Sequence, residues 1–289
     1  MEDANAVELS ATARPLDVSR VYAPIQSELT GLKRRLNETL QEDNSELDDI
    51  HRFVVQHPGK MLRPALVMLS AMAARRLEVS AGGLAGALSE PELERVRNLA
   101  LVVELLHNAS LVHDDVIDEA AHRRGTESLN ARYSGRIAVL GGDVLFSKAF
   151  GILARHFEPP VSTSVTDVTV RMCKGEILAA LRSGRKITSD EYYEITRMKT
   201  AEFAGVCSYA GALLVDRPEL AEELRLFGLE FGTAYQIVDD YVDGDYEHVD
   251  GFKIDWALTH ADRAKQSIRR LPSSASARLL GDFVDMVLS

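Results

Sequence analysis

The sequence contains a cluster of three carboxylates, Asp114, Asp115 and Asp118, at the end of an apolar stretch that begins at Leu99. Apolar residues recur in this stretch at helical spacing, so Asp114 and Asp118 are expected on the same face of a helix. Carboxylates in the last turn of a helix repel one another and face its negative dipole. Magnesium would offset this repulsion, because it binds one or two carboxylates together with substrate phosphate oxygens. Taken alone, the cluster is better explained as a solvated acidic helix end.

A second cluster, Asp239, Asp240 and Asp243, repeats the same spacing after another apolar stretch that begins at Phe231. The two clusters are more than a hundred residues apart, and both end a segment with helical spacing. We therefore expect them to face each other across a cavity. The repetition favours a metal site over two unrelated acidic helix ends and predicts magnesium as the cofactor.

The elements that position these carboxylates are predicted to be helices. Ala and Leu are abundant, aromatic residues make up 6% of the chain, and no strand-like alternation persists. We expect an all-α fold with one domain over 16–289, a bundle of about ten helices with a deep central cavity, after a disordered tail at 1–15. Helical spacing predicts helices at 16–40, 45–57, 64–77, 99–117, 141–157, 165–185, 191–214, 219–243, 256–271 and 275–287.

Local signals predict where these helices begin and where loops lie. Ser45 is expected to cap the second helix, and Ser189 or Asp190 the helix that starts at 191. Residues 79–92 are rich in Gly and are expected to form a surface loop, and 126–134 an exposed connection.

The composition limits the class of protein. The 289 residues are 46% hydrophobic and 27% charged, as in soluble globular proteins, and the net charge of -11 argues against nucleic acid as a partner. No signal pattern opens the chain, and no uninterrupted apolar run approaches the length of a transmembrane segment. We expect a cytoplasmic protein in which Cys173 and Cys207 are buried free thiols.

With two DDxxD motifs on helices, the sequence resembles the trans-polyprenyl diphosphate synthase family, in particular its medium- and long-chain bacterial type. The resemblance covers about residues 21–244 and, more weakly, the last helix. It implies a helical bundle of the isoprenoid synthase type, a homodimer, and magnesium-assisted condensation of isopentenyl diphosphate with an allylic diphosphate. It also implies metal ligands, with Asp114, Asp118 and Asp239 as the principal ones and Asp115, Asp240 and Asp243 in direct or indirect roles.

Cationic residues extend the resemblance. The segment GKMLRP is similar to the family's GGKRxRP, with Lys60 and Arg63 at matching positions and Met61 in place of an arginine. This implies that Lys60 and Arg63 bind isopentenyl diphosphate, together with His107 and Arg124, whereas Arg123 contacts the allylic diphosphate. Each residue has an ordinary structural explanation on its own. Their order around the first acidic motif favours an anion site.

Three further polar residues match family motifs. MKTAEFAG carries Lys199 and Thr200 at the positions implied to bind the allylic diphosphate and the forming cation, and Gln236 matches the glutamine of FQxxDD. The alternatives are a solvated lysine for Lys199, and a cap or a core hydrogen bond for Gln236. The catalytic residues implied by the resemblance are Asp114, Asp115, Asp118, Lys199, Thr200, Asp239 and Asp240.

The sequence departs from the family pattern in its second half. Ala179 stands where relatives carry glutamine or aspartate, and a block after the second acidic motif is shortened. Lys253, 14 residues after Asp239, lies near the family's substrate-binding lysine but lacks its glycine neighbour. The shortening leaves open a weakly or non-catalytic subunit of a heteromeric synthase. A terpene cyclase is a further alternative, although it does not need the isopentenyl site.

Two small residues before the first acidic motif carry a prediction about product length. Ala109 and Ser110 lie five and four positions before Asp114, where a growing chain anchored at the metal would first meet the wall of the cavity. Relatives that stop at short products generally carry a bulky aromatic residue there. We therefore expect a medium- or long-chain product.

Overall fold

The computed structural model describes residues 18–55, 59–77, 82–123 and 125–288, so the predicted tail at 1–15 lies outside the described residues. In chain order the elements are α2 (Val18–Tyr22), the 3-10 turn η1 (Ala23–Ile25), α3 (Gln26–Leu40), α4 (Ser45–Val55), α5 (Leu62–Ala74), α6 (Glu90–Ile117), β1 (His122–Arg123), β2 (Thr126–Glu127), α7 (Leu129–Arg132), α8 (Gly135–His156), α9 (Val161–Arg182), α10 (Ser189–Thr196), the π-helical turn η2 (Arg197–Ala201), α11 (Glu202–Leu214), α12 (Pro218–Asp243), α13 (Asp255–Arg270) and α14 (Ala275–Val287). The all-α prediction is confirmed.

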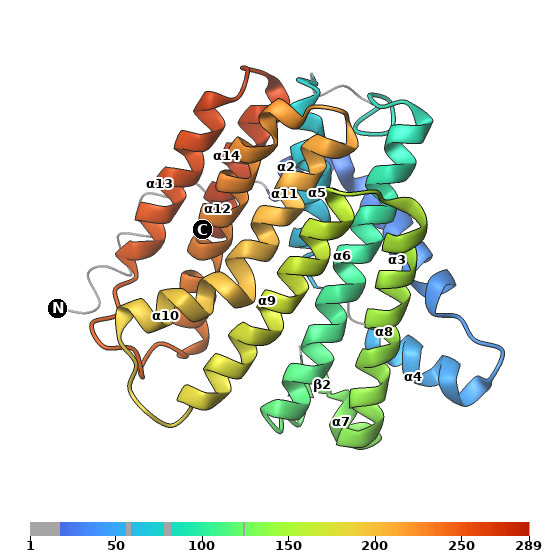
Figure 1. The fold of residues 1–289 in the computed structure, drawn as a ribbon, viewed down its shortest axis with the longest axis vertical. Helices are drawn as coiled ribbons and strands as arrows, with labels where there is room; N and C mark the ends of the chain where they lie inside the picture. The colour runs from blue at the N-terminus through green and yellow to red at the C-terminus, as the bar shows by residue number, and fades with distance from the viewer. Residues whose placement is uncertain (1–17, 56–58, 78–81, 124, 289) are drawn as a thin grey trace.

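The helices pack side by side as one bundle (Figure 1). Packing neighbours follow one another from α13 through α12, α11, α5 and α6 to α8. The helix α5 is buried from Pro64 to Ala74, and α6 is buried from Leu99 to Leu106. One hydrophobic core extends from Val21 to Val284 and therefore joins both ends of the described chain. The two acidic motifs end α6 and α12, two long helices of this bundle.

Helices α11 and α12 approach each other closely enough for backbone contact. A Cβ atom on Gly228 would lie 2.4 Å from the carbonyl oxygen of Ala204, and one on Gly232 would lie 2.9 Å from the Cα of Ala201. No side chain fits at Gly228 without moving the backbone. This contact fixes the position of α12, and with it the second acidic motif, against η2 and α11.

Several predicted helix ends differ from the structure. The first predicted helix is divided by η1, which contains Pro24, because proline lacks the N–H that a continuous helix would use. The side chain of Asn44, rather than Ser45, accepts the N–H groups of Glu46 and Leu47. Thr188, rather than Ser189 or Asp190, caps α10 in a reciprocal arrangement with Glu191.

The predicted loops are shorter than expected. Helix α6 begins at Glu90, inside the predicted loop 79–92, because Ser89 and Glu92 form a capping box. The short antiparallel pair β1–β2 begins before the predicted connection 126–134 and reaches into it, and α7 occupies its middle. These two-residue strands were not predicted from the sequence. Leu129 of α7 is buried, so the connection is not wholly exposed.

Helix α8 is the one helix among the described residues that is long and apolar enough to cross a membrane by length and composition alone. The mean hydropathy of its most apolar window is 1.7, and 39% of that window is buried. Arg136, Asp143 and Lys148 interrupt this helix, so it does not contradict the prediction that no uninterrupted apolar run approaches the length of a transmembrane segment. We interpret α8 as a helix of the bundle, because its residues Ala138, Leu145 and Ala149 are fully buried.

The two cysteines differ in environment. Cys207 on α11 is buried, as expected, and burial raises the pKa of its thiol to about 12. Cys173 on α9 is exposed, so the prediction of two buried thiols was wrong for this residue. The helix α9 turns that side chain away from the core.

Candidate active site

The first acidic motif ends α6. Asp114 is half-buried, and burial together with the negative charge of Glu176 on α9 raises the pKa of its carboxyl to about 7, against the opposing positive charges of Lys199 and Arg123. Asp118 is exposed at the C-cap, where its N–H donates to the carbonyl of Asp114 at 2.8 Å. A cation bound nearby would stabilise the ionised form of this half-buried carboxyl.

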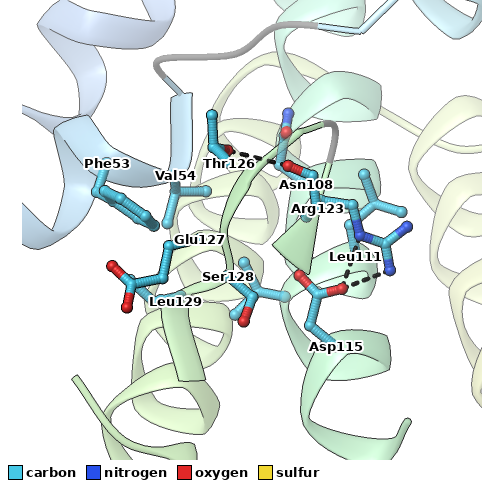
Figure 2. Close-up of a pocket in the computed structure, with 11 residues that line it drawn as sticks. Phe53, Val54, Asn108, Leu111, Asp115, Arg123, Thr126, Glu127, Ser128 and Leu129 are labelled. Carbon is cyan, nitrogen blue, oxygen red and sulfur yellow. Dashed lines mark hydrogen bonds and ion pairs between the residues drawn. The ribbon is translucent and has the colours of Figure 1, made fainter. Parts of the chain in front are cut away.

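Asp115 points to a different neighbour. Its side chain is buried, and both Nε and Nη2 of Arg123 lie within 2.6 Å of its Oδ1 (Figure 2). The amide of Asn130 donates to the Asp115 carbonyl at 3.1 Å. Asp115, which we predicted at the metal, and Arg123, which we predicted at the allylic diphosphate, thus form an ion pair with each other. Arg124, assigned to isopentenyl diphosphate, lies outside the described residues.

The Asp115–Arg123 ion pair forms one wall of a pocket between α4, α6 and the hairpin (Figure 2). Apolar side chains make up much of the rest of its lining: Phe53, Val54, Leu111, Val112 and Leu129. The residues that line this pocket include none from α9, η2 or α12. The deep cavity stays a prediction.

The π-helical turn η2 carries Lys199 and Thr200 and interrupts the single helix predicted at 191–214. The ammonium of Lys199 lies 2.5 Å from a carboxylate oxygen of Glu176, and its charge acts on Asp114. The hydroxyl of Thr200 donates to Oε1 of Gln236 on α12 at 2.7 Å. Turns of this kind often occur at functional sites. This one touches residues beside both acidic motifs.

The second acidic motif ends α12. Burial and the charge of Asp243 raise the pKa of the half-buried Asp239, whereas the positive charges of Lys60 and Arg63 and a hydrogen bond from Tyr235 lower it. Asp243 is exposed at the last position of the helix. The structure therefore brings Asp239 into the electrostatic reach of the two cations that the sequence assigned to isopentenyl diphosphate.

Asp240 is held by two side-chain donors. The hydroxyl of Tyr192 donates to its Oδ2 at 2.6 Å, and the amide of Gln236 donates to its Oδ1 at 2.7 Å. Burial raises the pKa of the Asp240 carboxyl, and both hydrogen bonds oppose that rise. Because both of its oxygens accept hydrogen bonds within the protein, Asp240 differs in environment from Asp239.

The cationic segment GKMLRP forms the turn before α5. Met61 adopts a left-handed backbone conformation with φ of 52°, and the hydroxyl of Tyr22 donates to the carbonyl of Lys60 at 2.9 Å. The Lys60 side chain is exposed. The guanidinium of Arg63 lies 5.3 Å from the ring centroid of Phe203, a distance typical of a cation–π contact.

The other predicted site residues lie on α6 and in the loop before α13. His107 is half-buried on α6 and accepts the Ser110 hydroxyl at its carbonyl. Ala109 is fully buried, and Ser110 is half-buried. Lys253 is exposed in the loop before α13, where its carbonyl accepts the N–H of Trp256. The roles assigned to these residues stay predictions.

Sequence reasoning missed three side chains that contact the predicted site. Glu176 pairs with Lys199, Tyr192 binds Asp240, and Phe203 lies under Arg63. Glu176 had a usable signal, since it lies in the same GEILAAL segment as Ala179. Tyr192 and Phe203 had none, because their partners are far away in the sequence.

The donor chemistry of the site fits magnesium. Asp114 and Asp239 are carboxylates whose raised pKa values reflect desolvation that a cation would offset. Within the described ranges, no group of three His, Cys, Asp or Glu side chains is assembled to hold a metal by itself. Magnesium does not require one, because it retains water and takes phosphate oxygens from its substrate.

Comparison with known proteins decides the family. A family model described as Polyprenyl synthetase matches residues 44–250, which is more than half of the chain. The chain belongs to the polyprenyl synthetase family. This confirms the family inferred from the two acidic motifs.

Individual members of the polyprenyl synthetase family are similar over most of this chain. It is 30% identical to an all-trans-nonaprenyl-diphosphate synthase (geranyl-diphosphate specific) of Rhodobacter capsulatus, over 77% of this chain and 65% of that protein. It is also 30% identical to a heptaprenyl diphosphate synthase component 2 of Geobacillus stearothermophilus, over 79% of this chain and 67% of that protein. The chain thus spans about two thirds of the length of these curated relatives.

Solved structures show the same fold. A polyprenyl synthase from Caulobacter crescentus CB15, complexed with calcium and isoprenyl diphosphate, matches with a TM-score of 0.81 at 22% identity, covering 96% of this chain and 98% of that one. A decaprenyl diphosphate synthase from Rhodobacter capsulatus matches with a TM-score of 0.80 at 21% identity, covering 93% and 98%. Coverage of this extent includes helices on both sides of residues 244–254.

Proposed function

We propose that this protein is a magnesium-dependent polyprenyl diphosphate synthase that condenses isopentenyl diphosphate with an allylic diphosphate to give a medium- or long-chain product. The observation that carries the proposal is the place of η2. Lys199 acts on Asp114 of the first motif, and Thr200 binds Gln236, which in turn binds Asp240 of the second. One turn thus links both acidic motifs, as a site for one diphosphate group requires.

In the proposed reaction the carbon–oxygen bond of the allylic diphosphate breaks, and the diphosphate leaves with the electron pair. Magnesium bound by Asp114, Asp118 and Asp239 would neutralise charge on the leaving group. Lys199 would exchange Glu176 for a diphosphate oxygen, and the Thr200 hydroxyl would face the developing cation. The double bond of isopentenyl diphosphate then bonds to the cationic carbon, and an oxygen of the departed diphosphate takes up a proton from the new cation, which leaves a neutral allylic chain.

The second substrate is assigned to the cations beside Asp239. Lys60 and Arg63 act electrostatically on that carboxylate, and the ring of Phe203 holds the Arg63 guanidinium. This arrangement supports a second anion site next to the first. It also favours an elongating synthase over a terpene cyclase, which does not bind isopentenyl diphosphate.

The direct test is to incubate the purified protein with isopentenyl diphosphate, a labelled allylic primer and magnesium, and to size the products. We expect labelled chains longer than geranylgeranyl. Consumption of the primer without incorporation of isopentenyl diphosphate would instead support a cyclase.

Lys60→Ala is expected to raise the KM for isopentenyl diphosphate about tenfold or more, because a charge-assisted hydrogen bond to the diphosphate is lost. The KM for the allylic primer should change little. Initial rates measured with each substrate varied in turn give the two constants.

Lys33→Ala is the matched control, because Lys33 is an exposed lysine on α3, away from the cationic turn. It should leave both constants unchanged. Equal effects of Lys60→Ala on the two substrates would contradict separate anion sites.

Ala109→Phe is expected to shorten the product while elongation continues. Ala109 is fully buried one turn before Asp114, so an aromatic ring there would block the growing chain without touching the metal ligands. Chromatography of the dephosphorylated products measures their length, and thermal unfolding shows whether the larger ring is accommodated.

Ser110→Ala is the control for Ala109→Phe, because it removes only a hydroxyl that binds the carbonyl of His107. Its products should match those of the wild type. If the folded Ala109→Phe variant makes products of unchanged length, another residue limits the chain.

We further propose a homodimer. Large apolar side chains are exposed on α8 and α9: Val139, Leu140, Val170, Ile177 and Leu181. An apolar surface of this kind supports burial against a second chain. The relative from Geobacillus stearothermophilus is described as component 2 of its synthase, which favours a heteromer as the second candidate. Light scattering of the purified chain and an activity assay without added protein distinguish the two.

A further inference from the structure

Asp240 is connected to a tyrosine that no part of the proposed reaction uses. Tyr192 lies on α10, 48 positions before Asp240, and is 5% exposed. Its hydroxyl reaches Oδ2 of Asp240, while Oδ1 accepts the Gln236 amide. Gln236 is in turn fixed by Thr200. The Asp240 carboxylate is therefore held in one orientation by donors on two different elements.

Tyr192 is itself held by an aromatic cluster. We define the cluster as Tyr192, Tyr193, Tyr241, Tyr246, Phe252 and Trp256. The rings of Tyr192 and Phe252 meet edge to face at 5.7 Å between centroids, and those of Tyr246 and Phe252 stack at 4.9 Å. Contacts of this kind stabilise a ring orientation beyond the burial of its area.

The aromatic cluster includes the shortened segment that follows the second acidic motif. Tyr246 and Phe252 lie in residues 244–254, between α12 and α13. The same segment pairs with Ile187, which donates its N–H to the carbonyl of His248 at 2.9 Å and accepts the N–H of Asp250 at 2.8 Å. The segment that carries Tyr246 and Phe252 is thus hydrogen-bonded to the backbone just before α10, the helix that carries Tyr192.

We propose that Tyr192 is a positioning residue for the second acidic motif: its hydroxyl aims the Asp240 carboxylate, and the aromatic cluster couples this carboxylate to segment 244–254. The metal–diphosphate role of the motif rests on the proposed function. The coupling itself rests on the hydrogen bonds and ring contacts. In this chain segment 244–254, with its stacked rings, stabilises the position of the second acidic motif.

The physical consequence concerns the order of the Asp240 carboxylate. Without the Tyr192 hydroxyl one of its two hydrogen bonds is lost, and the carboxylate can rotate about its side-chain bonds. Binding of a cation must then include the cost of ordering Asp240. Removal of the hydroxyl should therefore weaken metal binding and slow the ionisation step, with little effect on isopentenyl diphosphate.

The test is Tyr192→Phe, with Tyr193→Phe as the matched control from the same cluster. Trp256 is the one tryptophan of the sequence, and its ring centroid lies 6.2 Å from that of Tyr192. Its fluorescence during titration with magnesium and inorganic diphosphate therefore reports on the cluster. We expect half-saturation at about tenfold higher magnesium in Tyr192→Phe, the factor typical of losing one hydrogen bond to a charged group. Tyr193→Phe should remain within about twofold of the wild type.

Kinetic constants supply the second readout. In Tyr192→Phe we expect kcat to fall about tenfold while the KM for isopentenyl diphosphate stays unchanged, a division that a merely loosened fold would not produce. Far-UV circular dichroism and thermal unfolding should match those of Tyr193→Phe. Equal magnesium titrations and equal kcat values for both variants would overturn the proposal. If the wild type fails to elongate but the fluorescence titrations differ as described, the proposed function is wrong and the positioning role of Tyr192 stands.

Discussion

Asp114→Ala and Asp239→Ala are each expected to lower the rate of elongation by about a thousandfold or more, while the helical circular dichroism stays unchanged. Both carboxylates are half-buried, and desolvation raises both pKa values. Without a bound cation, the negative charge of either carboxylate therefore does not stabilise the folded chain. Their replacement should therefore remove metal binding without unfolding the bundle. Product formation at saturating magnesium measures the loss.

The matched control is Asp167→Ala, which removes an exposed carboxylate of α9 outside both acidic motifs. It should elongate at the rate of the wild type. Near wild-type turnover in either Asp114→Ala or Asp239→Ala would remove the basis for placing magnesium between the two motifs. A large loss in Asp114→Ala alone would place the metal on α6 and leave α12 with a structural role.

Gly228→Val is expected to destabilise the fold by about 3 kcal/mol or more, at the upper end of the range for overpacked cores. The Cβ atom would lie 2.4 Å from the carbonyl oxygen of Ala204 and 2.7 Å from the Ser208 hydroxyl, so α11 and α12 would have to separate. Because α12 carries the second acidic motif, activity should fall together with stability. Denaturant unfolding followed by circular dichroism measures the free energy of unfolding.

Gly281→Ala provides the comparison for this glycine. Gly281 lies inside α14, and a Cβ atom there would meet no other atom within 4 Å. Alanine should stabilise the chain by about 0.5–1 kcal/mol, because it restricts the unfolded chain and favours the helix. A stable Gly228→Val variant would show that the two helices can move apart without loss.

The parts of the fold that periodicity controls were predictable. Helix α12 runs from Pro218 to Asp243, against a prediction of 219–243, and α14 agrees with its predicted range at both ends. In both cases an apolar stripe sets the length of the helix. The caps were less predictable, since Asn44 and Thr188 each compete with an adjacent residue of similar chemistry. The difference between two such neighbours depends on backbone angles that composition does not specify.

The candidate site was predictable in its residues but not in their pairing. Asp114 and Asp115 are adjacent in the sequence, yet one faces Glu176 and the other Arg123, because successive residues of a helix point in different directions. Helical geometry alone indicates this divergence, although not which partner each residue finds. The contact between Tyr192 and Asp240 depends on how α10 packs, and no local pattern contains that information.

The π-helical turn at Arg197–Ala201 also determines how one continuous run of residues serves two sides of the molecule. Each residue of an ordinary helix advances about 100° around the axis, so a turn that holds one extra residue changes the phase of everything after it by that amount. Before the turn, α10 directs Tyr192 toward the end of α12. After it, α11 directs Phe203 toward the start of α5. An uninterrupted helix of the same sequence would be out of phase with one of these two partners, so this irregular turn is what allows a single segment to face both.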